Sequence, residues 1–162
     1  MGNPKPGSRT LAAAVHVARE LDGGEPGLVV DLATLGPALL DWQDPAVAEL
    51  VAAVGAADLV VVASPTYKGT YTGLLKLFLD RFATDGLRGV AVPLMLGAGP
   101  AHALAPELSL RPVLSEIGAS IPSRSLYLLD SSYDDPAVYQ RWLDEARPRI
   151  ARQLAALTGV TA

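Results

Sequence analysis

Three short segments bring together the residue types that hold anions and aromatic rings. The first is residues 2–10, which read Gly-Asn-Pro-Lys-Pro-Gly-Ser-Arg-Thr. If a helix follows, the Ser8 and Thr10 hydroxyls, the Arg9 guanidinium and the free N–H groups of the first turn suit a phosphate. The alternative is an ordinary helix start, in which Ser8 caps the helix and Arg9 is solvated. Taken alone, the motif favours this alternative.

The second segment, residues 64–73, reads Ser-Pro-Thr-Tyr-Lys-Gly-Thr-Tyr-Thr-Gly. Pro65 restricts the backbone, and Tyr67 offers a flat face on which a ring can lie. Thr66 and Lys68 supply hydrogen-bond donors. The alternative is a surface loop whose tyrosines pack on neighbouring helices, and for the second tyrosine both interpretations have equal weight.

The third segment, residues 97–102, reads Gly-Ala-Gly-Pro-Ala-His. Gly97 and Gly99 allow backbone amides to approach the edge of a ring directly. His102 is either a ligand contact or a histidine that bonds to backbone at a helix start.

Other chemistries find no support in the sequence. Gly2 and Gly7 have the spacing of a nucleotide phosphate loop, but Ser8 stands where that loop needs a lysine. The chain has no cysteine and only His16 and His102. We therefore expect no metal site, no nucleotide hydrolysis, no thiolate nucleophile and no Ser-His-Asp triad.

The elements that must position these loops follow from hydrophobic patterning. Aliphatic runs, each suited to a buried parallel strand, occur at residues 28–32, 59–64, 90–96 and 125–129. Helical patterns lie between or beside them, at residues 8–21, 45–56, 74–83 and 101–117 and from Pro136 onward. Within the fourth, Pro112 predicts an irregular turn. The alternation predicts an α/β domain with helices on both faces of a parallel sheet, whose three loops open at one edge.

Composition narrows the class of protein. The 162 residues suit one domain, and half of them are hydrophobic. The net charge of −4 comes from scattered charges, which argues against nucleic acid as a partner. No apolar run approaches the roughly 20 residues that span a bilayer, and the N-terminus does not resemble a signal peptide. We expect a cytoplasmic protein with no membrane association.

The three segments together resemble the NADPH-dependent FMN reductase family, a flavodoxin-like group that includes the reductase partners of two-component flavin monooxygenases. Residues 2–10 are similar to the family's phosphate loop, Gly-Ser/Asn-Pro-x-x-x-Ser-Arg-Ser/Thr. Residues 64–76 are similar to Ser/Thr-Pro-x-Tyr-x-x-x-Tyr-Ser-Gly-x-Leu-Lys. The resemblance covers most of the chain. It implies one flavodoxin-like FMN reductase domain over residues 1–162, a three-layer sandwich with a parallel sheet.

The resemblance also implies which residues hold the cofactor FMN. The phosphate would lie on Ser8, Arg9 and Thr10, and the ribityl chain beside Asn3 and Pro4. The flavin ring would lie against Pro65, Thr66, Tyr67 and Lys68, with Gly97, Gly99 and His102 in the third loop. These assignments are predictions carried over by position.

The implied reaction is hydride transfer from nicotinamide C4 of NADPH or NADH to flavin N5. Two alternatives stay open: a quinone or azo reductase with bound FMN, and a flavodoxin-like electron carrier that uses no nicotinamide. Implied partners are a second copy of the chain, in a homodimer or homotetramer, and a flavin-dependent monooxygenase. In such an oligomer Leu75, Leu79 and Phe82 would lie at the interface.

One feature departs from the family pattern. A flavodoxin-like sheet begins with a strand that leads into the phosphate loop, and that strand lies between the strands expected here at residues 28–32 and 59–64. In this sequence Met1 and Gly2 begin the loop itself. We expect either a shortened sequence, with an aliphatic run encoded before Met1, or direct pairing of the two flanking strands. Shortening is the favoured interpretation.

Overall fold

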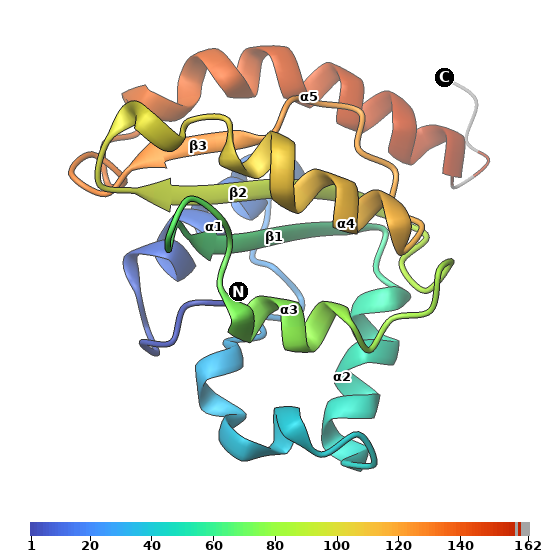
Figure 1. Cartoon of the computed structure of the whole chain (residues 1–162). Helices are drawn as coiled ribbons and strands as arrows, with labels where there is room; N and C mark the ends of the chain where they lie inside the picture. The colour runs from blue at the N-terminus through green and yellow to red at the C-terminus, as the bar shows by residue number, and fades with distance from the viewer. Residues whose placement is uncertain (158, 160–162) are drawn as a thin grey trace.

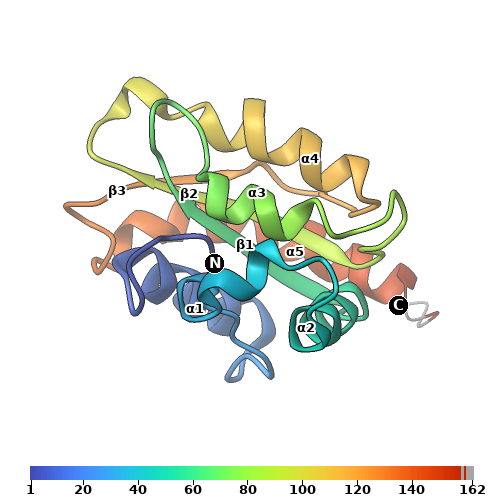
Figure 2. The same ribbon diagram turned by 60° about the horizontal axis from the view of Figure 1, so that its bottom comes forward.

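The computed structural model describes residues 1–157 and Gly159, which form a three-layer α/β sandwich (Figure 1). A parallel sheet in the order β1-β2-β3 makes the middle layer. Helices α1 and α5 cover one face, and α3 and α4 cover the other, as the turned view shows (Figure 2). The helices are α1 (Arg9–Asp22), α2 (Pro45–Gly55), α3 (Gly73–Leu79), α4 (Arg111–Glu116) and α5 (Ala137–Leu157), and the strands are β1 (Leu59–Pro65), β2 (Val90–Gly97) and β3 (Leu126–Leu129). The short 3-10 turns are Leu32–Thr34, Gly36–Leu40 and Pro100–His102, and Pro106–Leu110 is a π-helix.

The three strands lie where the sequence predicts them. Leu59 of β1 pairs with Val90 of β2, and at the other end Gly97 of β2 pairs with Leu129 of β3. All eight residues of β2 are buried, because it is the central strand and helices cover both of its faces. This explains why its sequence shows no polar alternation.

The first two predicted helices are confirmed within a residue of their bounds. Ser8 and Asp44 cap α1 and α2, and their side chains accept hydrogen bonds from N–H groups of the first turn. Gly23 ends α1 with a φ of 77°, a conformation that favours glycine.

The predicted irregularity near Pro112 is also confirmed. Pro112 has no N–H to offer the carbonyl one turn earlier. Just before it the chain widens into the π-helix Pro106–Leu110, and the Arg111 N–H donates to the Pro106 carbonyl five residues back. Helix α4 then begins at Arg111.

The predicted strand at residues 28–32 is wrong. Leu28 and Val29 are 47% and 48% exposed, and the segment belongs to no sheet in the part of the chain that the structure describes. Direct pairing of this segment with β1 is therefore not found either. The two stretches flank a cavity, so their backbones do not meet.

At one end of the cavity, Met1 and Gly2 lie between residues 28–32 and strand β1 and bond to both. The Met1 ammonium donates to the Val30 carbonyl (2.9 Å), and the Leu32 N–H donates to the Met1 carbonyl (3.1 Å). On the other side the Gly2 N–H donates to the Ala63 carbonyl (2.9 Å). These are the hydrogen bonds of a parallel strand.

The residues expected at an oligomer interface lie in the core instead. Leu75 is 2% exposed, Leu79 is 3% and Phe82 is 9%, and all three pack with β1 and β2. That expectation is wrong, because α3 turns its most apolar face toward the sheet. Within residues 1–157 and 159, no helix is both long and apolar enough to cross a membrane.

The Met1 ammonium makes stability depend on pH in a polypeptide that starts at Met1. Burial lowers its pKa from 8.0 to about 6, and the nearby Asp31 carboxylate opposes this only in part. Between pH 6 and 8 the unfolded chain therefore binds more protons than the folded one, and stability rises with pH. We expect a gain of about 2 kcal/mol in the free energy of unfolding from pH 6 to pH 8.

Urea unfolding at pH 6, 7 and 8 measures this gain, with intact mass confirming that Met1 is retained. Protein acetylated at its N-terminus is the control, because it carries no ammonium there. Equal pH profiles for the two forms would contradict the prediction.

Candidate functional site

The loops that follow β1, β2 and β3 open at one edge of the sheet, at the left of Figure 1. The loop before α1 lies at the same edge. Two contacts tie these loops together: the Thr72 hydroxyl donates to the Gly2 carbonyl, and Gly69 lies against the His102 ring. The predicted gathering of three loops is therefore found.

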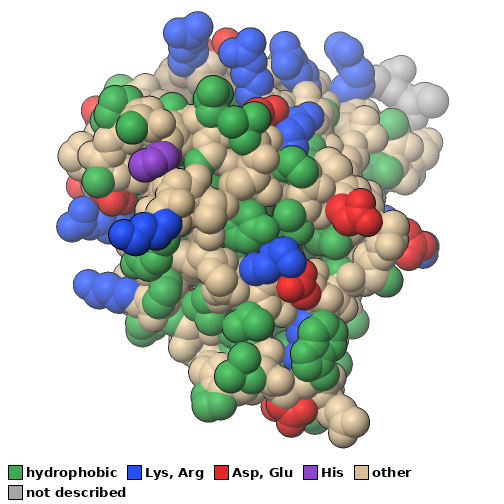
Figure 3. Space-filling view, in the orientation of Figure 1, with side chains coloured by type: hydrophobic (Ala, Val, Ile, Leu, Met, Phe, Trp, Pro, Cys, Tyr) green, Lys and Arg blue, Asp and Glu red, His purple; other side chains and the backbone are tan. Residues whose placement is uncertain are grey.

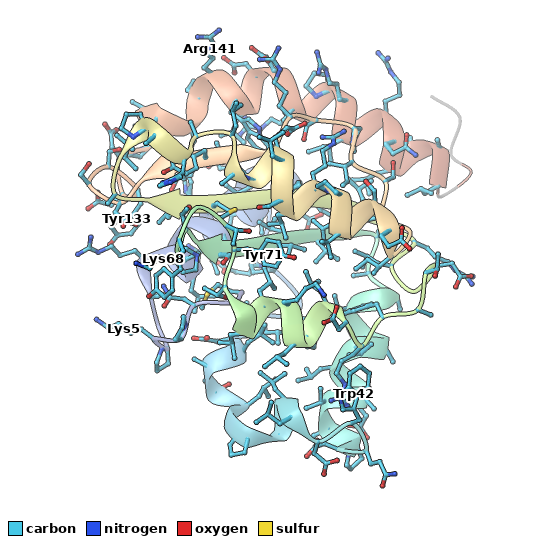
Figure 4. All side chains as sticks on the ribbon, in the orientation of Figure 1. Lys5, Trp42, Lys68, Tyr71, Tyr133 and Arg141 are labelled. Carbon is cyan, nitrogen blue, oxygen red and sulfur yellow. The ribbon has the colours of Figure 1, made fainter. Side chains whose placement is uncertain are left out.

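Basic groups border this edge. Lys5, Lys68 and Tyr133 lie there together, whereas Arg141 points away from α5 and Trp42 lies at the far end of the molecule (Figure 4). The space-filling view shows a histidine and several Lys and Arg side chains on the same side (Figure 3). Such a border favours an anionic ligand.

Asn3 organises the first loop. Its side-chain oxygen accepts from the Lys5 N–H (2.9 Å), and its amide donates to the Thr10 hydroxyl (3.3 Å). Thr10 is almost fully buried, while Pro4 is exposed. Asn3 and Thr10 therefore hold the loop against α1, and the outer surface of the loop is left to the other residues.

Ser8 and Arg9 stand at the start of α1. The Ser8 hydroxyl accepts from the Leu11 N–H (3.3 Å), which is the capping role, and donates to the Met1 sulfur (3.7 Å), a weak acceptor that a ligand oxygen can replace. The Arg9 guanidinium is exposed, donates to the Asp130 carbonyl (3.4 Å) and lies 6.0 Å from the centre of the Tyr133 ring. The capping interpretation and the phosphate interpretation of Ser8 are thus compatible.

A carboxylate also reaches the first loop. Asp31 accepts from the Gly7 N–H (2.9 Å) with one oxygen and from the Ala33 N–H (3.3 Å) with the other. One donor of the loop is therefore already engaged. The Leu11 N–H is engaged by the Ser8 hydroxyl, so the Arg9 and Thr10 N–H groups of the first turn of α1 remain for an anion.

The second loop ends in a tight turn. Tyr67 and Thr70 exchange two backbone bonds (2.9 and 3.3 Å), and between them Lys68 and Gly69 have φ values of 53° and 83°. Positive φ at both central positions makes this the two-residue hairpin turn that favours glycine. The turn holds the Tyr67 ring in the open, 52% exposed.

Thr66 carries an unsatisfied hydroxyl. Its Oγ1 is buried beside the Tyr127 phenol and makes no hydrogen bond of good geometry among the described residues. Its N–H donates to the Leu96 carbonyl (2.6 Å), which fixes Thr66 directly after Pro65 at the end of β1. The Thr66 hydroxyl at this edge is therefore suited to hydrogen-bond with a polar ring of a ligand.

The structure gives different reasons for glycine at position 97 and at position 99. A Cβ on Gly97 would lie 2.0 Å from the Tyr127 hydroxyl, and that hydroxyl donates to the Gly99 carbonyl (2.6 Å). Burial raises the pKa of Tyr127, which keeps the phenol protonated as a donor. Around Gly99 the space is open. Gly97 is thus required by packing, and Gly99 leaves room for a ligand.

Sequence reasoning missed several residues of this edge. They are Asp31, Thr72, Tyr127, Asp130 and Tyr133. Asp130 to Tyr133 follow the strand predicted at residues 125–129, so their place at its carboxyl end was a usable signal. Tyr127 and Thr72 act through bonds to residues far away in sequence, which no local pattern indicates.

The difference between the two glycines can be tested by stability alone. Gly97→Ala forces the Tyr127 ring to move and breaks its bond to Gly99, so we expect the free energy of unfolding to fall by about 1–3 kcal/mol. Gly99→Ala is the matched control, expected to change stability by less than about 0.5 kcal/mol. Urea unfolding of both variants measures this, and equal losses would show that Tyr127 does not impose Gly97.

Comparisons with known proteins agree with this geometry. The sequence profile of the family described as NADPH-dependent FMN reductase matches residues 1–134. An FMN reductase (NADPH) of Pseudomonas aeruginosa is 33% identical, with 92% of this chain and 84% of the relative covered. An FMN-dependent NADPH-azoreductase of Staphylococcus haemolyticus is 30% identical, over 86% of this chain and 81% of that protein.

Solved structures show the same architecture. The apo form of the NADH:FMN oxidoreductase EMOB superposes with a TM-score of 0.82 at 30% identity, covering 96% of this chain and 86% of that one. The profile match alone spans most of the chain and includes all three loops of the site. This chain therefore belongs to the NADPH-dependent FMN reductase family.

Proposed function

We propose that this chain reduces FMN with NADPH or NADH, by hydride transfer from nicotinamide C4 to flavin N5. The observation that carries the proposal is that a helix start with donors for an anion lies at the same sheet edge as the Thr66 hydroxyl, which is buried beside the Tyr127 phenol. The relatives named as FMN reductases support the same assignment.

The phosphate end of the proposed site is the start of α1. Arg9 supplies the charge, the Ser8 hydroxyl supplies a donor, and the first-turn N–H groups complete the anion site. Thr10, being buried, contributes its backbone N–H rather than a free hydroxyl. Asn3 and Pro4 shape the loop where the ribityl chain would pass.

The ring end of the proposed site lies between the second and third loops. Pro65 and Thr66 form its floor, and the turn at Lys68 sets Tyr67 beside it. The carbonyls of Gly97 and Gly99 are engaged by the Asp130 N–H and the Tyr127 hydroxyl, so those residues present a fixed backbone.

His102 stands at the outer end of this region. It is exposed, and its ring lies near Gly69 at the tip of the second loop, where a Cβ on Gly69 would be 3.5 Å from the ring. It therefore closes the side of the proposed ring site where the second and third loops meet.

FMN supplies the redox chemistry when bound, as an acceptor of hydride at N5. The chain's own residues have to bind and orient, and no side chain has to act as acid or nucleophile. Tyr67 is exposed at the mouth of the site, where a nicotinamide or another aromatic acceptor could stack.

A second candidate is reduction of a quinone or an azo compound by bound FMN. The 30% identity to an FMN-dependent NADPH-azoreductase favours it over the electron carrier. Turnover with free FMN against turnover with a quinone separates the two reductase functions. Use of nicotinamide separates both from the carrier.

We also propose the cellular location of the reaction, the partner enzyme and the oligomeric state. NADPH and NADH are cytosolic reductants, which supports a cytoplasmic site of action. Reduced FMN released from the chain would suit a flavin-dependent monooxygenase. A homodimer or homotetramer remains a proposal, and its interface would use exposed side chains such as Leu104 and Leu108, not Leu75, Leu79 and Phe82.

Absorbance spectra test the proposed reaction. The purified protein with FMN should lose its flavin absorbance near the visible maximum after anaerobic addition of NADPH or NADH. Flavin that binds but is bleached by neither nicotinamide would favour the carrier. Absence of flavin binding would overturn the proposal.

Arg9 should discriminate FMN from riboflavin, which lacks the phosphate. Arg9→Ala removes a charge-assisted hydrogen bond, so we expect FMN to bind roughly 10- to 100-fold more weakly while riboflavin binding is unchanged. Arg141→Ala is the matched control, because Arg141 is exposed on α5 away from the site. Quenching of flavin fluorescence measures the affinities. Equal weakening for both flavins would contradict the phosphate role.

A further inference from the structure

One tyrosine on helix α5 contacts two other parts of the molecule. Tyr139 is almost fully buried, in the part of the core that α1, α5 and the sheet share. Its ring meets the ring of His16 on α1 edge to face, with 4.4 Å between the ring centres. Its hydroxyl donates to the Tyr133 carbonyl in the segment that joins β3 to α5. Tyr139 therefore connects α1 to that segment.

The Tyr139 hydroxyl fixes the middle of this segment, residues 130–135. At the start of the segment the Asp130 N–H donates to the Gly97 carbonyl (2.9 Å). Among the described residues, Tyr133 makes no backbone–backbone hydrogen bond of its own. Burial raises the pKa of Tyr139 to about 12, so the phenol stays protonated near neutral pH and remains a donor. The Tyr133 backbone is thus held by this hydroxyl.

The same segment holds the arginine of the proposed phosphate site. The Tyr133 ring centre lies 6.0 Å from the guanidinium carbon of Arg9, at the outer range of a cation–π contact. The Asp130 carbonyl accepts from the Arg9 guanidinium (3.4 Å). Both contacts come from residues 130–135, so both change if that segment shifts. Without them an exposed arginine would sample many rotamers.

Helix α1 presents one face to the two tyrosines. Arg9 and His16 are seven residues apart on α1, which places them on the same side of the helix, about two turns apart. Tyr139 contacts this face at His16, and Tyr133 contacts it at Arg9. The position of the segment relative to α1 is therefore set at two points, and one of them is the arginine.

We propose that Tyr139 is a positioning residue for the FMN phosphate, acting through Tyr133 on Arg9. Its hydroxyl fixes the segment, and the segment holds the guanidinium near the start of α1 before the anion arrives. An arginine that is ordered in advance loses less conformational freedom on binding, which strengthens the complex. The inference rests on the proposed function, since it takes FMN as the ligand of this edge.

Tyr139→Phe tests the proposal, because it removes the hydroxyl and keeps the ring in the core. We expect FMN to bind roughly three- to tenfold more weakly, while the affinity for riboflavin, which has no phosphate, does not change. Quenching of flavin fluorescence measures both affinities. Unchanged binding of FMN, or equal weakening for the two flavins, would overturn the proposal.

Trp142→Phe is the matched control on the same helix. The Trp142 Nε1–H donates to the Arg124 carbonyl (2.8 Å), so this variant also removes one bond from α5, but to the segment before β3 instead of the one after it. It should bind FMN as the unaltered chain does, and thermal unfolding checks that both variants fold. An equal loss of FMN affinity in the two variants would indicate a general loosening of α5 and overturn the specific role of Tyr139.

A double variant separates positioning of the arginine from packing of the core. Tyr139→Phe should weaken FMN binding no further in a chain that already carries Arg9→Ala, since no guanidinium is left to position. Additive losses in the double variant would overturn the action through Arg9.

NMR of the flavin-free protein tests the placement of Arg9 without any ligand. The Tyr133 ring current shifts the resonance of the Arg9 Nε–H. In Tyr139→Phe this resonance should move toward the value of a free arginine and report faster motion. An unchanged resonance would overturn the inference while leaving the proposed function intact. Failure of the unaltered chain to bind FMN would instead overturn the proposed function, and the phosphate role of Tyr139 with it.

Discussion

The site depends on the two-residue ladder that Met1 and Gly2 form between Val30 and Ala63. Those bonds fix the start of the first loop to β1, and β1 ends in the second loop. The Thr72 hydroxyl then joins the two loops by donating to the Gly2 carbonyl. A flavin that spans a helix start and a strand end needs both at a constant separation. Among the described residues, the bonds of Met1, Gly2 and Thr72 hold that separation.

The residue types at positions 2, 65 and 72 explain which groups bond to Gly2. In a parallel ladder the Gly2 carbonyl would accept from the N–H two residues after Ala63, but that residue is Pro65, which has none. The Thr72 hydroxyl takes its place and also caps α3. Gly2 has to lack a side chain, because a Cβ there would lie 2.4 Å from the Cβ of Leu75. One glycine thus allows α3 to pack closely on the start of the phosphate loop.

Sequence patterns predicted what is decided locally. The aliphatic runs of β1, β2 and β3, the caps of α1 and α2 and the irregular turn before Pro112 follow from short-range rules, and so does the gathering of loops at one edge. Residues 28–32 have the composition of a strand, but among the described residues they pair only with Met1, and composition does not indicate whether a pairing strand is present. The family resemblance places Leu75 at an oligomer interface, but the helix pattern alone does not show that Leu75 packs against β1 and β2. The contacts of Tyr127 and Asp31 join distant segments and were not predictable.

The first loop also shows how a phosphate site can be held in shape by the protein alone. Asp31 occupies the Gly7 N–H, and the Asp130 carbonyl and the Tyr133 ring hold the Arg9 guanidinium near the start of α1. A bound phosphate would replace the weak 3.4 Å bond of Arg9 with a charge-assisted one, so little is lost when the anion enters. The Asp31 carboxylate cannot be exchanged in this way, since it also caps the turn at Ala33 and would repel the incoming charge. Anion affinity in this loop is therefore a balance between the exposed Arg9 and a carboxylate that the fold itself requires.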